Sequence, residues 1–381
     1  MKSMTLLQYS DMIHFEFKIE KEKKIINGKS KTVLKLPEKE TGLVRISELK
    51  PRLTKFIKND LKKADINIYE EFKDLIENKR IFPEDKGSSY FKIITEPKKI
   101  DKYIYKTFGK DNEIGSYFGE YCGVWFDEVE VKIFSRVKRL EELVEKALKS
   151  FLIINNLGQR QSKGFGSFVI DGTTKEEFEK VLKSFYKSIY KKELEKDDVP
   201  LEIIHKEYQL IKSGVNESFF KKGKYHQRRY EKSKLFEYFC EKNIRWEKKK
   251  IKEVLNELGL MEKLEYYHEP IDCNKKERLN YKYIRGLLGV APFIKFKQKN
   301  HKNPFFTISI SGEVERYPSP ITFKVFEDIY AVANDIDEDI LNKKFFFKVG
   351  SKNVRINTPS SFDLPDFMNY AFRELNWQRI K

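Results

Sequence analysis

Two stretches in the first part of the chain alternate between apolar and polar residues, at 12–19 and 125–134. Successive side chains of a strand point to opposite faces of a sheet, so each of these stretches predicts a strand with one buried face. Residues 90–95 also predict a strand. The apolar side of the first stretch consists of Ile13, Phe15, Phe17 and Ile19. The lysine-rich residues 21–40, with Asn27-Gly28 near their middle, predict a turn or hairpin tip.

A helical period separates these strands. Residues 43–62 predict one helix, in which Pro51 must sit in the first turn or mark a break. A shorter amphipathic piece follows near 67–78. The strongest helical pattern of this half is a single apolar stripe with spacings of three and four residues. It consists of Val137, Leu140, Leu143, Val144, Ala147, Leu148 and Phe151.

The order of these elements predicts an α+β domain. Strand, helix, strand, strand and helix are followed by a glycine-rich loop and a short strand at 167–170. This is the split βαβ order of a ferredoxin-like, or RRM-like, fold, with an antiparallel sheet and both helices on one face. Thr174 and Glu177 then form a capping box, which predicts that another helix begins there.

The glycine-rich loop, residues 155–168, is the strongest candidate site. Glycine lets backbone N–H groups approach a ligand closely, and arginine and lysine supply charge for phosphate. Phe165 and Phe168 are expected in the core, and the alternative interpretation is an ordinary helix-to-strand connection. The GxxxxGK[ST] order of a nucleotide-binding loop is absent, so the predicted ligand is a nucleic-acid backbone. The candidate contacts are Asn156, Gly158, Gln159, Arg160, Gln161, Ser162, Lys163, Gly164 and Gly166.

A basic segment follows. Residues 191–199 read as a solvated linker ended by Pro200, and residues 201–262 predict mostly helix. Between residues 221 and 234, cations with interleaved Tyr225, His226 and Tyr230 suit a nucleic-acid backbone with stacked bases, although a solvated helix face is the alternative. The candidate contacts here are Lys221, Lys222, Lys224, Arg228 and Arg229.

The last third predicts a second, β-rich α+β domain. Strand patterns occupy 290–297, 305–310, 320–333 and 344–349, and a closing helix is expected at about 363–377. We therefore predict three parts: a ferredoxin-like domain at 1–190, a basic helical insertion at 191–275, and the β-rich domain at 276–381.

Composition narrows the class of protein. The net charge of +17 and the pI near 9.3 point to a polyanionic partner. No apolar run is long enough to span a membrane. Three widely separated cysteines argue against a disulfide framework and against a cysteine-rich zinc site, and they fit the cytoplasm. We expect no metal and no cofactor.

Three stretches together resemble the RAMP superfamily, the RNA-binding subunits of CRISPR ribonucleoproteins. Residues 157–168 resemble its glycine-rich loop, and residues 283–289 resemble a turn that opens a helix in such domains. Residues 315–324 contain R-x-x-S-P and resemble the start of a strand in two-domain type III subunits of the Cmr class. The resemblance covers about 11–171 and 280–377, and it makes the second domain a degenerate RAMP domain, because that domain lacks a glycine loop of its own.

The resemblance implies a non-catalytic RNA-binding subunit of a type III effector in antiviral defence. Its partners would be guide or target RNA and other effector subunits, with no membrane involved. Arg45, Arg285 and Arg316 are further candidates for RNA contact, each beside the start of a helix or strand.

The alternative implied by the same family is a metal-independent endoribonuclease that processes precursor RNA. His14 lies early in the chain and would serve as its general acid or base. The histidines show no HxxxH or HExxH spacing, which disfavours zinc chemistry. A DNA- or ribosome-associated basic protein is the third class.

Overall fold

The computed structural model describes most of the chain in two compact units. Unit 1 comprises residues 1–186, 193–202 and 323–330, and unit 2 comprises 187–192, 203–322 and 331–381. The division does not follow chain order, because Phe323–Tyr330 belong to unit 1. The predicted three-part boundaries stay a prediction. The described residues are 1–5, 7, 20–26, 29–35, 41–42, 44–82, 90–95, 98–99, 102–104, 115–116, 119–120, 123–125, 128–217, 220–221, 224–225, 229–259, 280–297 and 305–381.

Two antiparallel strand pairs form the sheet structure around the glycine-rich loop. β1 (Lys2–Ser3) pairs with β12 (Phe168–Val169), and β5 (Phe91–Thr95) pairs with β11 (Val131–Ser135). The two pairs are linked where Met1 and Val129 exchange backbone hydrogen bonds. The strand predicted at 90–95 is confirmed as β5, in which every second residue is buried. The predicted strand at 12–19, with His14, lies outside the described residues.

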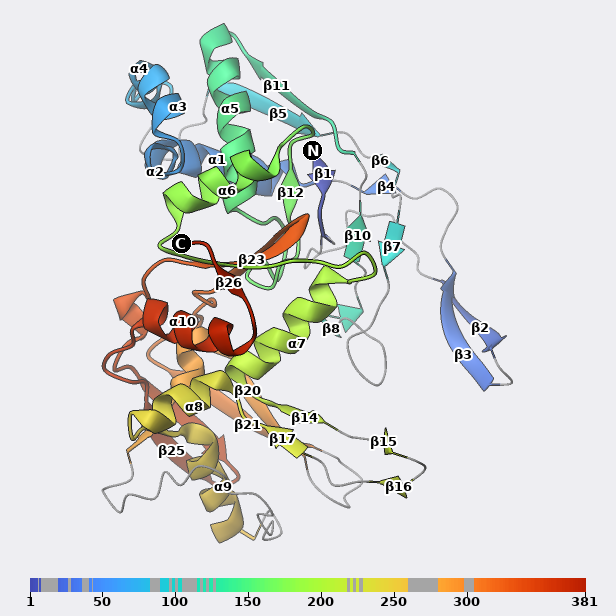
Figure 1. The fold of residues 1–381 in the computed structure, drawn as a ribbon, viewed down its shortest axis with the longest axis vertical. Coiled ribbons are helices and arrows are strands. Elements are labelled where there is room, and N and C mark those ends of the chain that lie inside the picture. Colours follow the sequence, from blue (N-terminus) through green and yellow to red (C-terminus); the bar gives the residue numbers. More distant parts are fainter. Residues whose placement is uncertain are drawn as a thin grey trace. The chain divides into compact units, whose positions relative to one another are not determined.

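Helices pack against the buried side of these strands. α1 (Ile46–Asn59) and α5 (Lys138–Ile154) carry apolar stripes, and the rings of Phe56 and Phe151 meet edge to face at 5.7 Å. Figure 1 shows α5 running beside β11. The predicted capping box begins α6 (Lys175–Phe185) and is confirmed. Three short helices follow α1: α2 (Leu61–Ala64), α3 (Ile66–Glu71) and α4 (Lys73–Ile76).

Pro51 occupies a position that the sequence argument did not allow. α1 begins at Ile46, which places Pro51 in the second turn, inside a continuous helix. The missing N–H leaves the carbonyl of Ser47 without its helical partner. Both Ser47 and Pro51 are exposed, so water is able to solvate that carbonyl. The expectation of a first-turn proline or a break was wrong for this reason.

A β-hairpin and several short strand pairs complete unit 1. β2 (Glu20–Ile26) and β3 (Lys29–Lys35) pair antiparallel along their whole length, on either side of the predicted turn at residues 27–28, which are not described. The short pairs are β4 (Thr41–Gly42) with β6 (Lys98–Lys99), β7 (Lys102–Ile104) with β10 (Gly123–Trp125), and β8 (Gly115–Ser116) with β9 (Gly119–Glu120).

Unit 2 is built on an antiparallel sheet in the order β20–β21–β24–β25. Its strands are Phe293–Lys297, Phe305–Gly312, Lys344–Val349 and Lys352–Asn357. The closing helix is α10 (Leu364–Glu374), and Phe372 stacks on Tyr190 of β13 (Ser188–Lys192), which pairs with β26 (Gln378–Arg379). The strands predicted in the last third are confirmed, including β22 (Thr322–Phe326) and β23 (Asp328–Ala333), of which residues 323–330 belong to unit 1, whereas β25 was not predicted.

Further helices of unit 2 flank this sheet. α8 (Lys234–Glu241) and α9 (Glu247–Glu257) bracket β18 (Arg245–Trp246), which pairs in parallel with β19 (Tyr281–Lys282). The segment that resembled a helix-opening turn forms a 3₁₀ helix, η2 (Ile284–Leu288), and a second one, η3, spans Glu338–Ile340. Cys240 takes part in a disulfide bond.

The basic segment is only partly helical. α7 (Pro200–Lys212) begins at the proline that ended the predicted linker, but antiparallel strands follow it. β14 (Val215–Glu217) pairs with β17 (Arg229–Glu231), and β15 (Phe220–Lys221) pairs with β16 (Lys224–Tyr225). The helical prediction was wrong over these residues. They lack an apolar stripe of helical period and are rich in aromatic residues that favour strands.

Candidate nucleic-acid interface

The glycine-rich loop begins where α5 ends and doubles back before β12. Backbone φ is positive at Gly158, Arg160, Gly164 and Gly166, with a value of 68° at Gly166. A Cβ at Gly166 would lie 1.8 Å from the carbonyl oxygen of Leu157, whose N–H donates to the Gly166 carbonyl at 2.8 Å. No side chain fits this close approach, so glycine at 166 is required for the shape of the loop.

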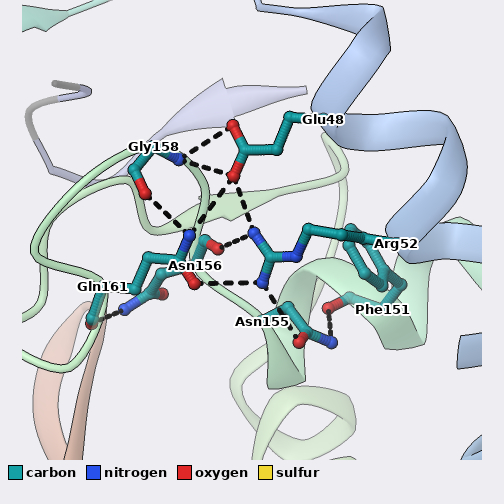
Figure 2. Close-up of polar contacts among 7 residues, drawn as sticks. All are labelled: Glu48, Arg52, Phe151, Asn155, Asn156, Gly158 and Gln161. Atoms are coloured by element: carbon teal, nitrogen blue, oxygen red, sulfur yellow. Dashed lines mark hydrogen bonds and ion pairs between the residues drawn. The ribbon is translucent and has the colours of Figure 1, made fainter. Parts of the chain in front are cut away.

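Two side chains of α1 hold the start of the loop. The Gly158 N–H donates to both carboxylate oxygens of Glu48, at 2.9 and 3.1 Å. Arg52, one turn further along α1, donates to Glu48 at 2.7 Å and to the carbonyl oxygen of Asn156 at 2.8 Å. Figure 2 shows the carboxylate and the guanidinium converging on the loop. A protein carboxylate therefore already accepts from one of the N–H groups that had been predicted to receive phosphate.

Gln161 closes this network from the other side. Its amide nitrogen donates to the Gly158 carbonyl at 2.7 Å and to Glu48 at 3.2 Å. Its amide oxygen accepts from Arg52 at 3.1 Å (Figure 2). Both ends of this side chain are thus engaged within the protein. The amide of Asn155 extends the network, accepting from Arg52 at 3.4 Å and donating to the Phe151 carbonyl at 3.2 Å.

Asn156 joins the loop to a strand from much later in the chain. The residue is buried, and its amide nitrogen donates to the carbonyls of Gln161 and Phe323, at 2.6 and 2.9 Å. Its amide oxygen accepts from the Ser167 hydroxyl and from the Lys324 ammonium. The Phe323 N–H also donates to the carbonyl of Ser162 at 3.2 Å. Residues 323 and 324 therefore lie directly behind the loop, within unit 1.

Lys324 is a lysine whose side chain lies in the interior of the protein. The side chain is buried in unit 1 and also donates to the carbonyl of Leu152 at 3.0 Å. Burial, followed by the nearby Arg52 guanidinium, lowers the pKa of Lys324 well below its ordinary value. A buried amine is tolerated here because two oxygen atoms accept its hydrogen bonds. Its role is to support the loop from within the protein.

The part of the loop that reaches solvent is its tip, residues 159–163. Gln159, Arg160 and Ser162 are half-buried, and Lys163 is exposed. The Arg160 guanidinium lies 5.7 Å from the centre of the Phe165 ring, which is buried, as is Phe168. Desolvation by neighbouring atoms and then the Arg160 charge lower the pKa of Lys163, although its side chain still reaches water. The tip thus presents two cations side by side.

The remaining candidate cations lie in different settings. Arg45 is the N-cap of α1 and is half-buried, and Arg316 is exposed in unit 2. Arg285 forms an ion pair with Glu247 in which the side chains are only 12% and 0% exposed, so it is built into the interior of unit 2. Lys221, Lys224 and Arg229 lie on strands β15, β16 and β17, whereas Lys222, Arg228 and His14 are outside the described residues.

Sequence reasoning missed the three residues that hold the loop. The spacing of Glu48 and Arg52 is that of an i, i+4 ion pair on a helix, which was a visible signal. Lys324 is the single charged residue within the apolar strand β22, and a lone charge in a buried strand is the signal that marked it. In the described part of the chain, no cluster of three or more His, Cys, Asp or Glu could hold a metal ion. No helix in that part is long and apolar enough to cross a bilayer.

Comparison with protein families gives two matches that together span most of the chain. The family model of the Cmr1 N-terminal domain matches residues 31–215, and the model of the Cmr1 C-terminal domain matches residues 230–381. The first match contains the glycine-rich loop, and the second contains η2 and β22. Neither the curated proteins nor the solved structures yield a match.

Proposed function

This chain belongs to the Cmr1 family of RAMP-type subunits of type III CRISPR effectors, and we propose that it holds guide or target RNA in that complex without cleaving it. The observation that carries the proposal is the loop tip, where Arg160 and Lys163 reach solvent on a loop fixed from within. Preorganised cations bind phosphate without the entropic cost of ordering long side chains. Such contacts position RNA without reading its sequence.

The internal network divides the predicted contacts into two groups. The side-chain amides of Asn156 and Gln161 form hydrogen bonds within the protein, and the Gly158 N–H donates to Glu48. We therefore assign these three residues to holding the loop in shape rather than to RNA contact. Gly164 and Gly166 are buried and shape the loop. The RNA contacts that we propose are then Arg160 and Lys163 for phosphate, with Gln159 and Ser162 hydrogen-bonding sugar or base.

We further propose a ferredoxin-like fold for unit 1. The backbone pairing supports a strand order of β12, β1, β11, β5, because Met1 pairs with Val129 just ahead of β11. α1 and α5 follow β1 and β11, which are the first and third strands of this sheet along the chain, as the split βαβ arrangement requires. β1 rather than residues 12–19 would then be the first strand. We also propose that the second, β-rich domain is a degenerate RAMP domain.

RNA binding by the double variant Arg160→Ala/Lys163→Ala tests the function. For single-stranded RNA, two lost phosphate contacts lower the slope of log affinity against log salt by roughly 1.4, with the largest loss of affinity at low salt. Fluorescence anisotropy with a labelled single-stranded RNA at several salt concentrations measures both quantities. The matched control, Lys55→Ala/Lys180→Ala, removes the same charge from exposed positions on α1 and α6. Unchanged affinity and slope in the loop variant would refute the proposal.

The same preparation separates binding from catalysis. Incubation of the full chain with repeat-containing RNA in EDTA leaves the RNA intact if the subunit only binds. Discrete cleavage that disappears in His14→Ala would instead establish the metal-independent endoribonuclease.

A further inference from the structure

The strand pair β5–β11 of unit 1 has one buried face and one open face. Phe91, Ile93 and Thr95 of β5 are buried, so the alternate residues turn away from the core. The register places Lys92 opposite Phe134 and Ile94 opposite Lys132. Tyr90 and Arg136 continue the alternation one residue beyond the pair. The open face is defined by Tyr90, Lys92, Ile94, Lys132, Phe134 and Arg136.

Three large apolar side chains on this face are exposed to solvent. Tyr90 is 61% exposed, Phe134 is 48% exposed and Ile94 is 41% exposed. They lie on adjacent strands rather than scattered singly. Contiguous exposed apolar groups on a protein surface mark binding sites.

The charge on the open face has one dominant sign. Lys92, Lys132 and Arg136 belong to it, whereas among the described residues Glu130 lies 3.8 Å from Lys132 and the Glu141 carboxylate accepts the Ser135 N–H at 2.6 Å. Each cross-strand pair sets a cation beside an apolar side chain, so aromatic surface and positive charge alternate about every 7 Å along a strand. Cores of protein–protein interfaces are depleted in lysine, and this face is not. Aromatic platforms flanked by cations are the features that bind single-stranded nucleic acid.

We propose that the open face of β5–β11 binds single-stranded RNA, with bases stacked on Phe134 and Tyr90 and phosphates bound by Lys92, Lys132 and Arg136. The inference rests on the proposed RNA-binding function and adds a second contact region to the loop tip. The two regions act differently. The open face adds stacking, which depends little on salt, to its phosphate contacts, whereas the loop tip contributes through charge without an aromatic platform.

The test compares double variants of the full chain. Tyr90→Ala/Phe134→Ala removes the aromatic platform, and because both side chains are exposed we expect it to fold as the unmodified protein does. Affinity for a labelled single-stranded RNA falls by roughly 5- to 150-fold for each base that loses its stacking partner, while the salt slope stays unchanged. The matched control is Phe293→Ala/Phe346→Ala, which removes two comparably exposed rings from unit 2.

A second measurement locates the contact directly. Photo-crosslinking of RNA that contains 4-thiouridine, followed by mass spectrometry, is expected to label peptides that contain Tyr90 or Phe134. The inference is overturned if the loop variant loses RNA binding, the aromatic variant binds RNA as the unmodified protein does, and no crosslink forms at the open face. The proposed function would still stand after that result. Unchanged binding in both the loop and the aromatic variants refutes the function as well.

The remaining outcome concerns a protein partner. If the aromatic variant binds RNA normally but no longer co-purifies with the other effector subunits, the open face is a subunit interface and the inference is overturned.

Discussion

Each unit contains an arginine–glutamate pair that fixes a glycine-bearing segment, and the two pairs differ in burial. In unit 1, Glu48 accepts the Gly158 N–H and pairs with Arg52, with 19% and 29% of the two side chains exposed. In unit 2, Glu247 accepts the Ile284 N–H at the start of η2 and pairs with Arg285, with 0% and 12% exposed. The same chemistry thus supports a solvent-reaching loop in one place and an interior turn in the other.

Each pair also has a lysine with a lowered pKa beside it. In unit 1 this lysine is Lys324, and in unit 2 it is Lys248, whose pKa falls to about 7 through burial and then through the charges of Arg285 and Lys252. Basic side chains therefore outnumber the carboxylate in both clusters. What distinguishes them is that only the cluster of unit 1 supports a loop whose cations reach solvent.

The largest effect is expected from Glu247→Gln. The substitution leaves the Arg285 guanidinium buried without its counter-charge, which costs about 3–5 kcal/mol in the free energy of unfolding. Urea denaturation measures the change. Glu257→Gln is the control on the same helix, since its pair with Lys352 is half-exposed and contributes less than about 1 kcal/mol. A loss below about 1 kcal/mol for Glu247→Gln would show that the pair does not hold η2.

Charge and burial also explain which residues the sequence could identify. Arg285 looked like a surface cation because it stands at the start of a turn, and only the position of Glu247, thirty-eight residues earlier, shows that it is an interior ion-pair partner. Arg52 passed unnoticed although its i, i+4 partner was visible, because that spacing alone does not reveal the loop it holds. The charge of a residue can be read from the sequence, but the residue that it pairs with elsewhere in the fold cannot.

Elements governed by local periodicity were predicted well. The stripe of α5, the capping box of α6, the strand β5 and the burial of Phe165 and Phe168 follow from neighbours in sequence. The contact of Lys324 with Asn156 joins residues 168 positions apart, and no local period contains it. The strands at 215–231 were missed, because the helical prediction for 201–262 did not separate out a stretch that lacks an apolar stripe of helical period.

A smaller effect is expected from Glu48→Ala. The Gly158 N–H and Arg52 lose a shared acceptor, but both are near water, so the free energy of unfolding falls by about 1–3 kcal/mol. Hydrogen exchange across residues 155–168 should accelerate, because the loop loses its attachment to α1. Glu142→Ala, at an exposed position on α5, controls for removal of a carboxylate. Unchanged exchange in the loop would show that Glu48 does not fix it.

The smallest effect concerns the pH dependence of stability in the cluster of unit 2. The pKa of Lys248 is about 7 in the folded protein and has an ordinary value of 10.5, so between these values the unfolded chain binds more protons than the folded one. Stability therefore rises with pH in this window and gains nothing further from this group above it. One proton corresponds to at most about 1.4 kcal/mol per pH unit, and partial exposure of the side chain reduces this slope.

Lys248→Met isolates this contribution, because it removes the titrating amine, which lies 5.0 Å from the centre of the Trp246 ring, and keeps an apolar side chain of similar length. Denaturation midpoints at about pH 7.5, 8.5 and 9.5, all within this window, should rise less steeply in this variant than in the unmodified protein. Lys249→Met, which removes the same charge from the neighbouring position, should retain the steeper rise. Parallel pH profiles for all three proteins would mean that Lys248 is protonated in the fold, and the Arg285–Glu247 pair would then tolerate a further full positive charge beside it.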